Sequence, residues 1–204
     1  MNLIEVMVAG AIAFLVSMTI FFVIVPSFRI VSEGQILTEL QQQGELALQQ
    51  LTADLQNTVP TGTSLAFPIN AGDGMITATH PVTTALGSGI LNFQPQLLIW
   101  YHNITKKQLF RKRFSNGDPS GVVLSFLPAV ALQTTRLNLD LICNQTNGTE
   151  KSFAKNVETF WVEKEYTSGG EVYASRIVLQ KDIPGKNKKS VVELFRKAML
   201  RNHY

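Results

Sequence analysis

The chain has 204 residues, of which 45% are hydrophobic and 9% aromatic, so it can bury a core and is neither disordered nor of low complexity. Only 16% of the residues are charged, which makes a membrane-spanning segment the first thing to look for. The net charge is +3, with the basic excess downstream of residue 100, and the single cysteine, Cys143, excludes an intramolecular disulfide and a cysteine-based zinc site. We expect Cys143 to be a small buried side chain.

The first segment, residues 6 to 28, carries no charge in VMVAGAIAFLVSMTIFFVIVPSF. Its length suits a helix that crosses a bilayer, which needs ~20 apolar residues, and it lacks the basic region that precedes the apolar run of a signal peptide. We therefore predict one retained membrane span. Glu5, at its start, is costly in hydrocarbon and needs a cationic partner. Pro26, near its end, lacks an N–H and predicts a helix kink.

The helical period continues through residues 29 to 59, with glutamines and glutamates opposite an apolar face. The residues on that face are Ile30, Gly34, Leu37, Gly44, Leu48, Leu51 and Leu55. Span and amphipathic part together predict one helix of about fifty residues, about 80 Å long at 1.5 Å per residue. We expect it to end near Val59, because Pro60 and Gly62 are helix breakers.

Beyond this helix the sequence predicts a loop region and then a sheet. Residues 60 to 94 favour a loop with at most short strands, because Gly, Pro, Thr and Asn outnumber large apolar residues. In residues 95 to 204 apolar and polar residues alternate in short runs bounded by turn residues. This pattern predicts an antiparallel sheet under the amphipathic helix. The expected strands are residues 95–103, 107–114, 121–127, 135–143, 157–166 and 172–180. In residues 135–143 leucines alternate with polar residues, as on a strand with one buried face.

The start of the chain resembles a known family. Residues 3 to 9, LIEVMVA, resemble the start of mature type IV pilins and type II secretion pseudopilins, which have phenylalanine or methionine first and glutamate at the fifth position. The resemblance implies that Met1 is exposed and methylated after a prepilin peptidase removes a leader. It also implies that Glu5, with Leu3 beside it, acts in assembly by meeting the amino-terminal amine of a neighbouring subunit.

Later residues resemble one subgroup of that family, the minor pilins of the PilW type and the pseudopilins of the GspJ type. The similar segments are IWYHNITKKQLFRKR, NVETFWVEKEY and the ending Leu200, Arg201 and Asn202. On this resemblance residues 190 to 201 are a final strand, although their composition also suits a helix. The implied fold is α+β and pilin-like: a long N-terminal helix, membrane-spanning over residues 1–28 and amphipathic over 29–59, packed on an antiparallel sheet domain over 95–204.

The expected function is that of a minor pilin or pseudopilin, a structural subunit that primes or caps a type IV pilus or a type II secretion pseudopilus. The implied partners are other minor and major pilins or pseudopilins, contacted through N-terminal helices, the prepilin peptidase, and an inner-membrane assembly platform with a cytoplasmic motor ATPase. The implied location is the bacterial inner membrane, single-pass with a periplasmic C-terminal domain, before extraction into a filament. A less favoured alternative is a single-span anchor for a periplasmic binding domain.

A further alternative is a DNA-binding tip subunit of a competence pilus. It depends on a basic cluster around Phe110, whose charge could meet a nucleic-acid backbone, as could the lysines at 186, 188 and 189. The cluster comprises Lys106, Lys107, Arg111, Lys112 and Arg113. Lys and Arg alternating on a hairpin more often mark an exposed face that resists aggregation, so DNA binding is not favoured.

The sequence shows no catalytic pattern. His80, His102 and His203 are far apart and have no Ser, Cys or carboxylate at motif spacing. The AGDG run at 71–74 precedes no helix signal, and Asp73 alone lacks a calcium ligand set. We therefore expect no enzyme, no cofactor and no metal.

Overall fold

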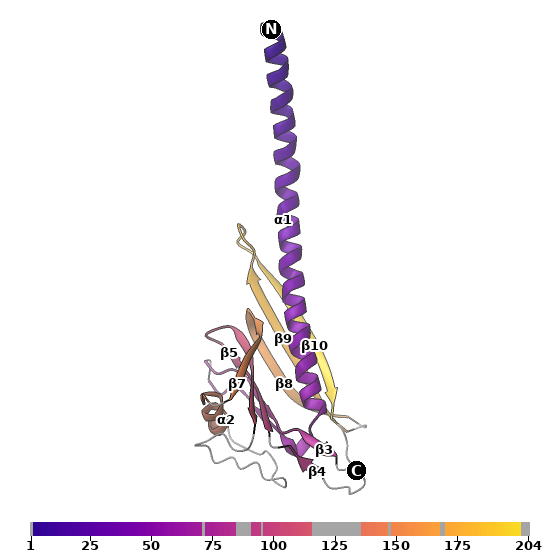
Figure 1. Ribbon diagram of the computed structural model, residues 1–204, viewed down its shortest axis with the longest axis vertical. Helices are drawn as coiled ribbons and strands as arrows, with labels where there is room; N and C mark the ends of the chain where they lie inside the picture. Colours follow the sequence, from indigo (N-terminus) through magenta and orange to yellow (C-terminus); the bar gives the residue numbers. More distant parts are fainter. Residues whose placement is uncertain are drawn as a thin grey trace.

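The computed structural model describes residues 2–70, 72–84, 91–94, 96–115, 136–146, 148–167 and 170–200. Its elements are helix α1 (Leu3–Gln56), 3-10 helix η1 (Pro60–Gly62), β1 (Thr63–Ala66), β2 (Ile76–Thr79), β3 (Val82–Thr84), β4 (Leu91–Phe93), β5 (Gln96–Asn103), β6 (Gln108–Ser115), α2 (Arg136–Cys143), β7 (Thr149–Lys155), β8 (Val157–Thr167), β9 (Gly170–Asp182) and β10 (Lys189–Met199). The long apolar helix and the antiparallel sheets confirm the predicted α+β class. Figure 1 shows α1 rising out of the remaining elements, which we call the head.

Helix α1 is continuous over 54 residues and runs through Pro26 without a break. Its second half packs on the head along one face. The buried residues recur at three- and four-residue spacing, which places them on the same side of the helix. These are Ile36, Leu40, Gly44, Ala47, Leu48, Leu51, Thr52, Asp54 and Leu55. The predicted single long helix is therefore confirmed, and it ends three residues before the expected position at Val59.

Two main sheets form the head. One has the order β1-β2-β5-β6-β7 and the other β10-β9-β8, and all pairs are antiparallel. Strands β5, β6, β8, β9 and β10 confirm the strands predicted over 95–103, 107–114, 157–166, 172–180 and 190–201, whereas the predicted strand 121–127 lies outside the described residues. Strand β7 was missed, because it is a sheet edge whose residues are mostly exposed and polar.

The strand predicted over residues 135–143 is wrong, because this segment forms α2. Leu139 and Ile142, three residues apart, are buried against the five-stranded sheet, while Leu137 and Leu141 are 70% and 53% exposed. In eight residues, alternating leucines also fit a helix whose buried positions are three or four apart. The ion pair of Arg136 with Asp140, four residues on, also favours the helix.

The core has two parts, one on each side of the five-stranded sheet. The larger part joins α1 to both sheets and centres on side chains such as Leu51, Trp100 and Ile177. The smaller part lies between the five-stranded sheet and α2. Helix α1 approaches β9 and β10 closely at Gly44, where an added Cβ would lie 2.5 Å from a methyl group of Leu194. A larger residue at position 44 would therefore require the side chains of Leu194 and Leu179 to move.

Candidate functional site

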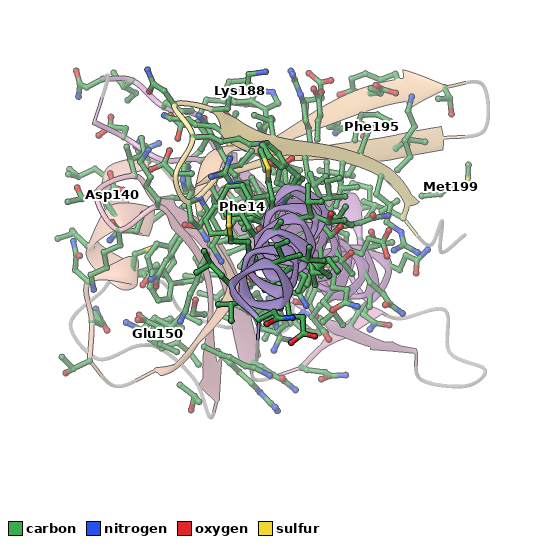
Figure 2. All side chains as sticks on the ribbon, turned by 90° about the horizontal axis from the view of Figure 1, so that it is seen from above. Phe14, Asp140, Glu150, Lys188, Phe195 and Met199 are labelled. Carbon is green, nitrogen blue, oxygen red and sulfur yellow. The ribbon has the colours of Figure 1, made fainter. Side chains whose placement is uncertain are left out.

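The most prominent surface of the molecule is the N-terminal part of α1, Leu3–Val31, which we call the apolar half of α1. Every residue in it is exposed except Val25, which is half-buried. The helix is long and apolar enough to cross a membrane, and its most apolar stretch is not buried by the head. Figure 2, the view from above, shows Phe14 on this helix with the head behind it. So large an apolar surface needs a lipid or protein partner.

Glu5 lies in the first turn of this half. Its Oε2 accepts a hydrogen bond from the backbone N–H of Asn2 at 3.0 Å, as in a capping box, and a carboxylate there also suits the helix dipole. Within the described residues, which do not include Met1, Glu5 takes part in no ion pair. Leu3 is 79% exposed beside it. The carboxylate is therefore held at the helix start by its own backbone.

The predicted basic cluster does not form one surface. Arg111 points toward α1, where its Nε and Nη2 donate to the two carboxylate oxygens of Asp54 at 2.7 and 3.0 Å. The Nε1–H of Trp100 donates to the same carboxylate at 2.8 Å. Asp54 is only 4% exposed, so this bidentate pair joins the end of α1 to β6 inside the core.

Lys112 points to the opposite face of β6, as the alternation of a strand requires. It is 4% exposed, and its Nζ donates to the backbone carbonyls of Cys143 at 2.9 Å and of Gln145. These carbonyls lie at the C-terminal end of α2, where a cation is stabilising. Lys112 therefore holds α2 against the sheet.

The other members of the cluster lie at the surface. Lys107 pairs with Glu158 at 2.8 Å, and this hydrogen bond lowers the pKa of the Glu158 carboxyl. Lys106 lies 5.7 Å from the ring centre of Phe110, and Arg113 is exposed. The cluster thus offers a nucleic acid fewer free cations than its sequence suggests.

A polar concavity of about 250 Å³ lies between the β5–β6 turn, the 72–74 loop and α2. Arg136 lines it, with its Nε 3.3 Å from Asp140 and 3.8 Å from Asp73. The backbone N–H of Asn70 donates to Asp73 and lowers the pKa of that carboxyl. In the part of the chain that the structure describes, no group of three or more His, Cys, Asp or Glu side chains could hold a metal, and the expected lack of a metal stays a prediction.

His80 and His102 have separate structural positions. The ring Nε2 of His80 lies 2.7 Å from the carbonyl oxygen of Gln94, and that of His102 lies 3.1 Å from the carbonyl oxygen of Val157. Burial lowers the pKa of both imidazoles, so both rings favour the neutral form. His203 lies outside the described residues.

Two ion pairs that the sequence did not reveal join the β9–β10 hairpin to α1. Lys181 lies 2.8 Å from Glu39, and Lys186 pairs with Glu33. The available signal was the uneven charge along the chain, with carboxylates on the N-terminal helix and lysines downstream. That pattern indicates attraction between the two parts but does not identify the pairs.

No protein-family model, curated protein or solved structure matches the chain. Function must therefore be inferred from the residues and their arrangement.

Proposed function

We propose that this chain is a minor subunit of a type IV pilin-like filament, one that helps to prime or cap a type IV pilus or a type II secretion pseudopilus. The observation that carries the proposal is the continuity of α1. One 54-residue helix presents an exposed apolar half and buries its other half in the head. An anchor alone needs no rigid connection to its domain, whereas a subunit of a helical bundle does.

The same apolar surface serves two environments in turn. In the membrane it faces lipid, and in a filament it packs against the helices of neighbouring subunits. Small residues let helices approach closely, and a Cβ added at Gly10 would meet nothing within 4 Å in the isolated chain. The other small residues near it are Ala9, Ala11 and Ala13.

Glu5 sets the register of that packing. A carboxylate is costly in hydrocarbon, by about 2.5–3.5 kcal/mol at the middle of a bilayer and less toward its edge, where Glu5 lies, so a cationic partner in an apolar environment is favoured. In a parallel bundle of such helices, the amino-terminal amine of a neighbour is the cation that reaches this depth. The resemblance of residues 3–9 to mature pilins supports this role for Glu5 and processing at Met1.

The proposal includes a location and partners. The subunit sits in the bacterial inner membrane with its head in the periplasm, and a prepilin peptidase processes it. An assembly platform with a motor ATPase then extracts it among other pilins or pseudopilins. Its role is structural and not catalytic. We do not propose DNA binding, because Arg111 and Lys112, two of the five residues behind that alternative, make internal contacts.

The test is Glu5→Ala in the cells that make the protein, with Glu45→Ala as the matched control. Glu45 is an exposed carboxylate on the head half of the same helix. We expect Glu5→Ala to resist alkaline extraction from membranes but to be depleted from the filament fraction, whereas Glu45→Ala assembles normally. Normal incorporation of Glu5→Ala into filaments would refute the proposal.

Mass spectrometry of sheared filaments and of the remaining membranes identifies the machine. A methylated peptide starting at Met1 in sheared filaments would indicate a surface pilus. The same peptide only in membranes would indicate a secretion pseudopilus. A peptide that extends upstream of Met1 without processing would contradict the pilin-like assignment.

A further inference from the structure

The β9–β10 hairpin is the part of the head that reaches furthest toward the apolar half of α1 (Figure 1). Its strands stay paired up to Asp182 and Lys189, and the turn closes with a 3.0 Å hydrogen bond from the N–H of Ile183 to the carbonyl of Lys188. The ion pairs of Lys181 and Lys186 hold the hairpin along α1. The tip, residues 183–189, is therefore level with Glu33.

This level corresponds to the membrane surface if residues 6–28 span the bilayer. Glu33 is five residues beyond Phe28, which is about 8 Å along a helix at 1.5 Å per residue. The polar headgroup region extends about 5–8 Å beyond the hydrocarbon core on each side of a bilayer. The helix geometry thus places the hairpin tip at the level of the lipid phosphates or just outside them, on the side where the head lies.

The tip has the charge to bind there. Lys186, Lys188 and Lys189 are exposed on it, and Arg29 is exposed on the adjacent helix. Three carboxylates lie near these four cations: Glu33 pairs with Lys186, Asp182 stands opposite Lys189 in the strand register, and the charge of Lys189 helps to lower the pKa of the Glu158 carboxyl. Figure 2 shows Lys188 on the side of α1 away from Glu150, so Lys188 is separate from the surface around Glu150 on β7.

We propose that the β9–β10 tip docks on the anionic phospholipid headgroups of the membrane that α1 spans. Lysines near an anionic surface attract lipid phosphates, and the attraction weakens with salt. The span and the tip together attach the head at two points, which fixes its orientation before assembly. Extraction of α1 must then break the contact at the tip. The inference rests on the proposed membrane span but not on filament formation.

The test uses the full chain reconstituted into vesicles, with a fluorophore at position 187 introduced by Asn187→Cys in a Cys143→Ser background. Quenching by lipids with a nitroxide headgroup reports contact between the tip and the headgroups. A label introduced by Thr146→Cys, next to α2 and away from the hairpin tip, is the reference. We expect quenching at position 187 to exceed that at position 146 at least about threefold in phosphatidylglycerol-rich vesicles, and to fall in high salt or in neutral phosphatidylcholine.

A charge-reversed pair gives the second measurement. Lys188→Glu with Lys189→Glu is expected to lower quenching at position 187 to the reference value. Arg113→Glu with Lys151→Glu, the same change of charge on β6 and β7, is expected to leave it unchanged. Equal quenching at positions 187 and 146, or no dependence on lipid charge, would overturn the proposal while alkaline-resistant insertion still supports the span. Failure of the chain to insert would refute the span itself.

Discussion

The buried ion pair between Asp54 and Arg111 yields the sharpest prediction on stability. Asp54, 4% exposed near the end of α1, accepts hydrogen bonds from Arg111, Trp100 and Gln50. Asp54→Ala removes the acceptor for all three donors. It leaves the Arg111 guanidinium without its counter-charge and the Trp100 N–H without a partner.

The magnitude follows from burial. Removing one partner of a buried pair costs about 3–5 kcal/mol, and the Arg111 side chain, 21% exposed, keeps enough hydration to favour the lower part of that range. The indole of Trp100 is fully buried, so its unpaired N–H adds about 1–3 kcal/mol where water cannot enter. We expect Asp54→Ala to lower the free energy of unfolding by about 3–5 kcal/mol. A domain has only about 5–15 kcal/mol in total.

The assay is urea unfolding of the full chain in detergent, followed by circular dichroism, because the substitution changes the surroundings of Trp100 and hence its fluorescence. Glu39→Ala is the control. It removes an exposed pair with Lys181, which contributes at most about 1 kcal/mol. If Asp54→Ala costs no more than Glu39→Ala, the pair does not hold α1 to the sheet. The double variant Asp54→Leu with Arg111→Met should recover part of the loss, because apolar residues often replace buried pairs well.

Three further predictions use the same unfolding assay. Gly44→Val is expected to cost about 1–3 kcal/mol by overpacking against β9 and β10, while Gly34→Val, in open space, stays within about 0.5 kcal/mol; equal values would contradict the close approach. Leu139→Ala is expected to cost about 2–5 kcal/mol and Leu141→Ala less than about 0.5 kcal/mol, whereas a strand would make both costly. Cys143, which the sequence predicts to be buried, is half-buried, and this burial raises the pKa of its thiol to about 12, so the unfolded chain loses this proton first. Stability should therefore fall as pH rises from about 9 toward about 12, and Cys143→Ala should show a smaller fall.

The long-range elements of the fold could be predicted where a pattern persists. In α1 the apolar period extends over many turns, and in β8 and β9 the alternation extends over most of each strand, so chance agreement is small. The eight residues of α2 fit both the three- or four-residue spacing of a helix and the two-residue alternation of a strand. Only the packing of Leu139 and Ile142 on the sheet decides between the two. In β7 the edge position removes the apolar alternation altogether.

The candidate site could be predicted only in part, because partners distant in sequence decide what a charged residue does. The residues at 111, 112 and 113 have the same charge, and strand alternation alone predicts that the middle one faces away from the other two. It does not predict that Arg111 pairs with Asp54, 57 positions earlier in the chain. Nor does it predict that Lys112 donates to a backbone carbonyl at the end of α2. Charge reversal at all three positions would therefore disrupt the core, and a test of DNA binding should change only Lys106 and Arg113.

In the assembly proposed above, extraction from the membrane requires that force on the apolar half of α1 reach the head. Because α1 is unbroken from Leu3 to Gln56, the force passes along one helix to the contacts of its second half, among them Gly44 against β10 and Asp54 with Arg111. Weakening those contacts would lower both stability and assembly. Changing Glu5, which lies outside the head, should lower assembly and leave unfolding of the head unchanged. Measuring the free energy of unfolding and the incorporation into filaments for Asp54→Ala and Glu5→Ala therefore separates two defects. One is the loss of force transmission from α1 to the head, and the other is the loss of packing between N-terminal helices.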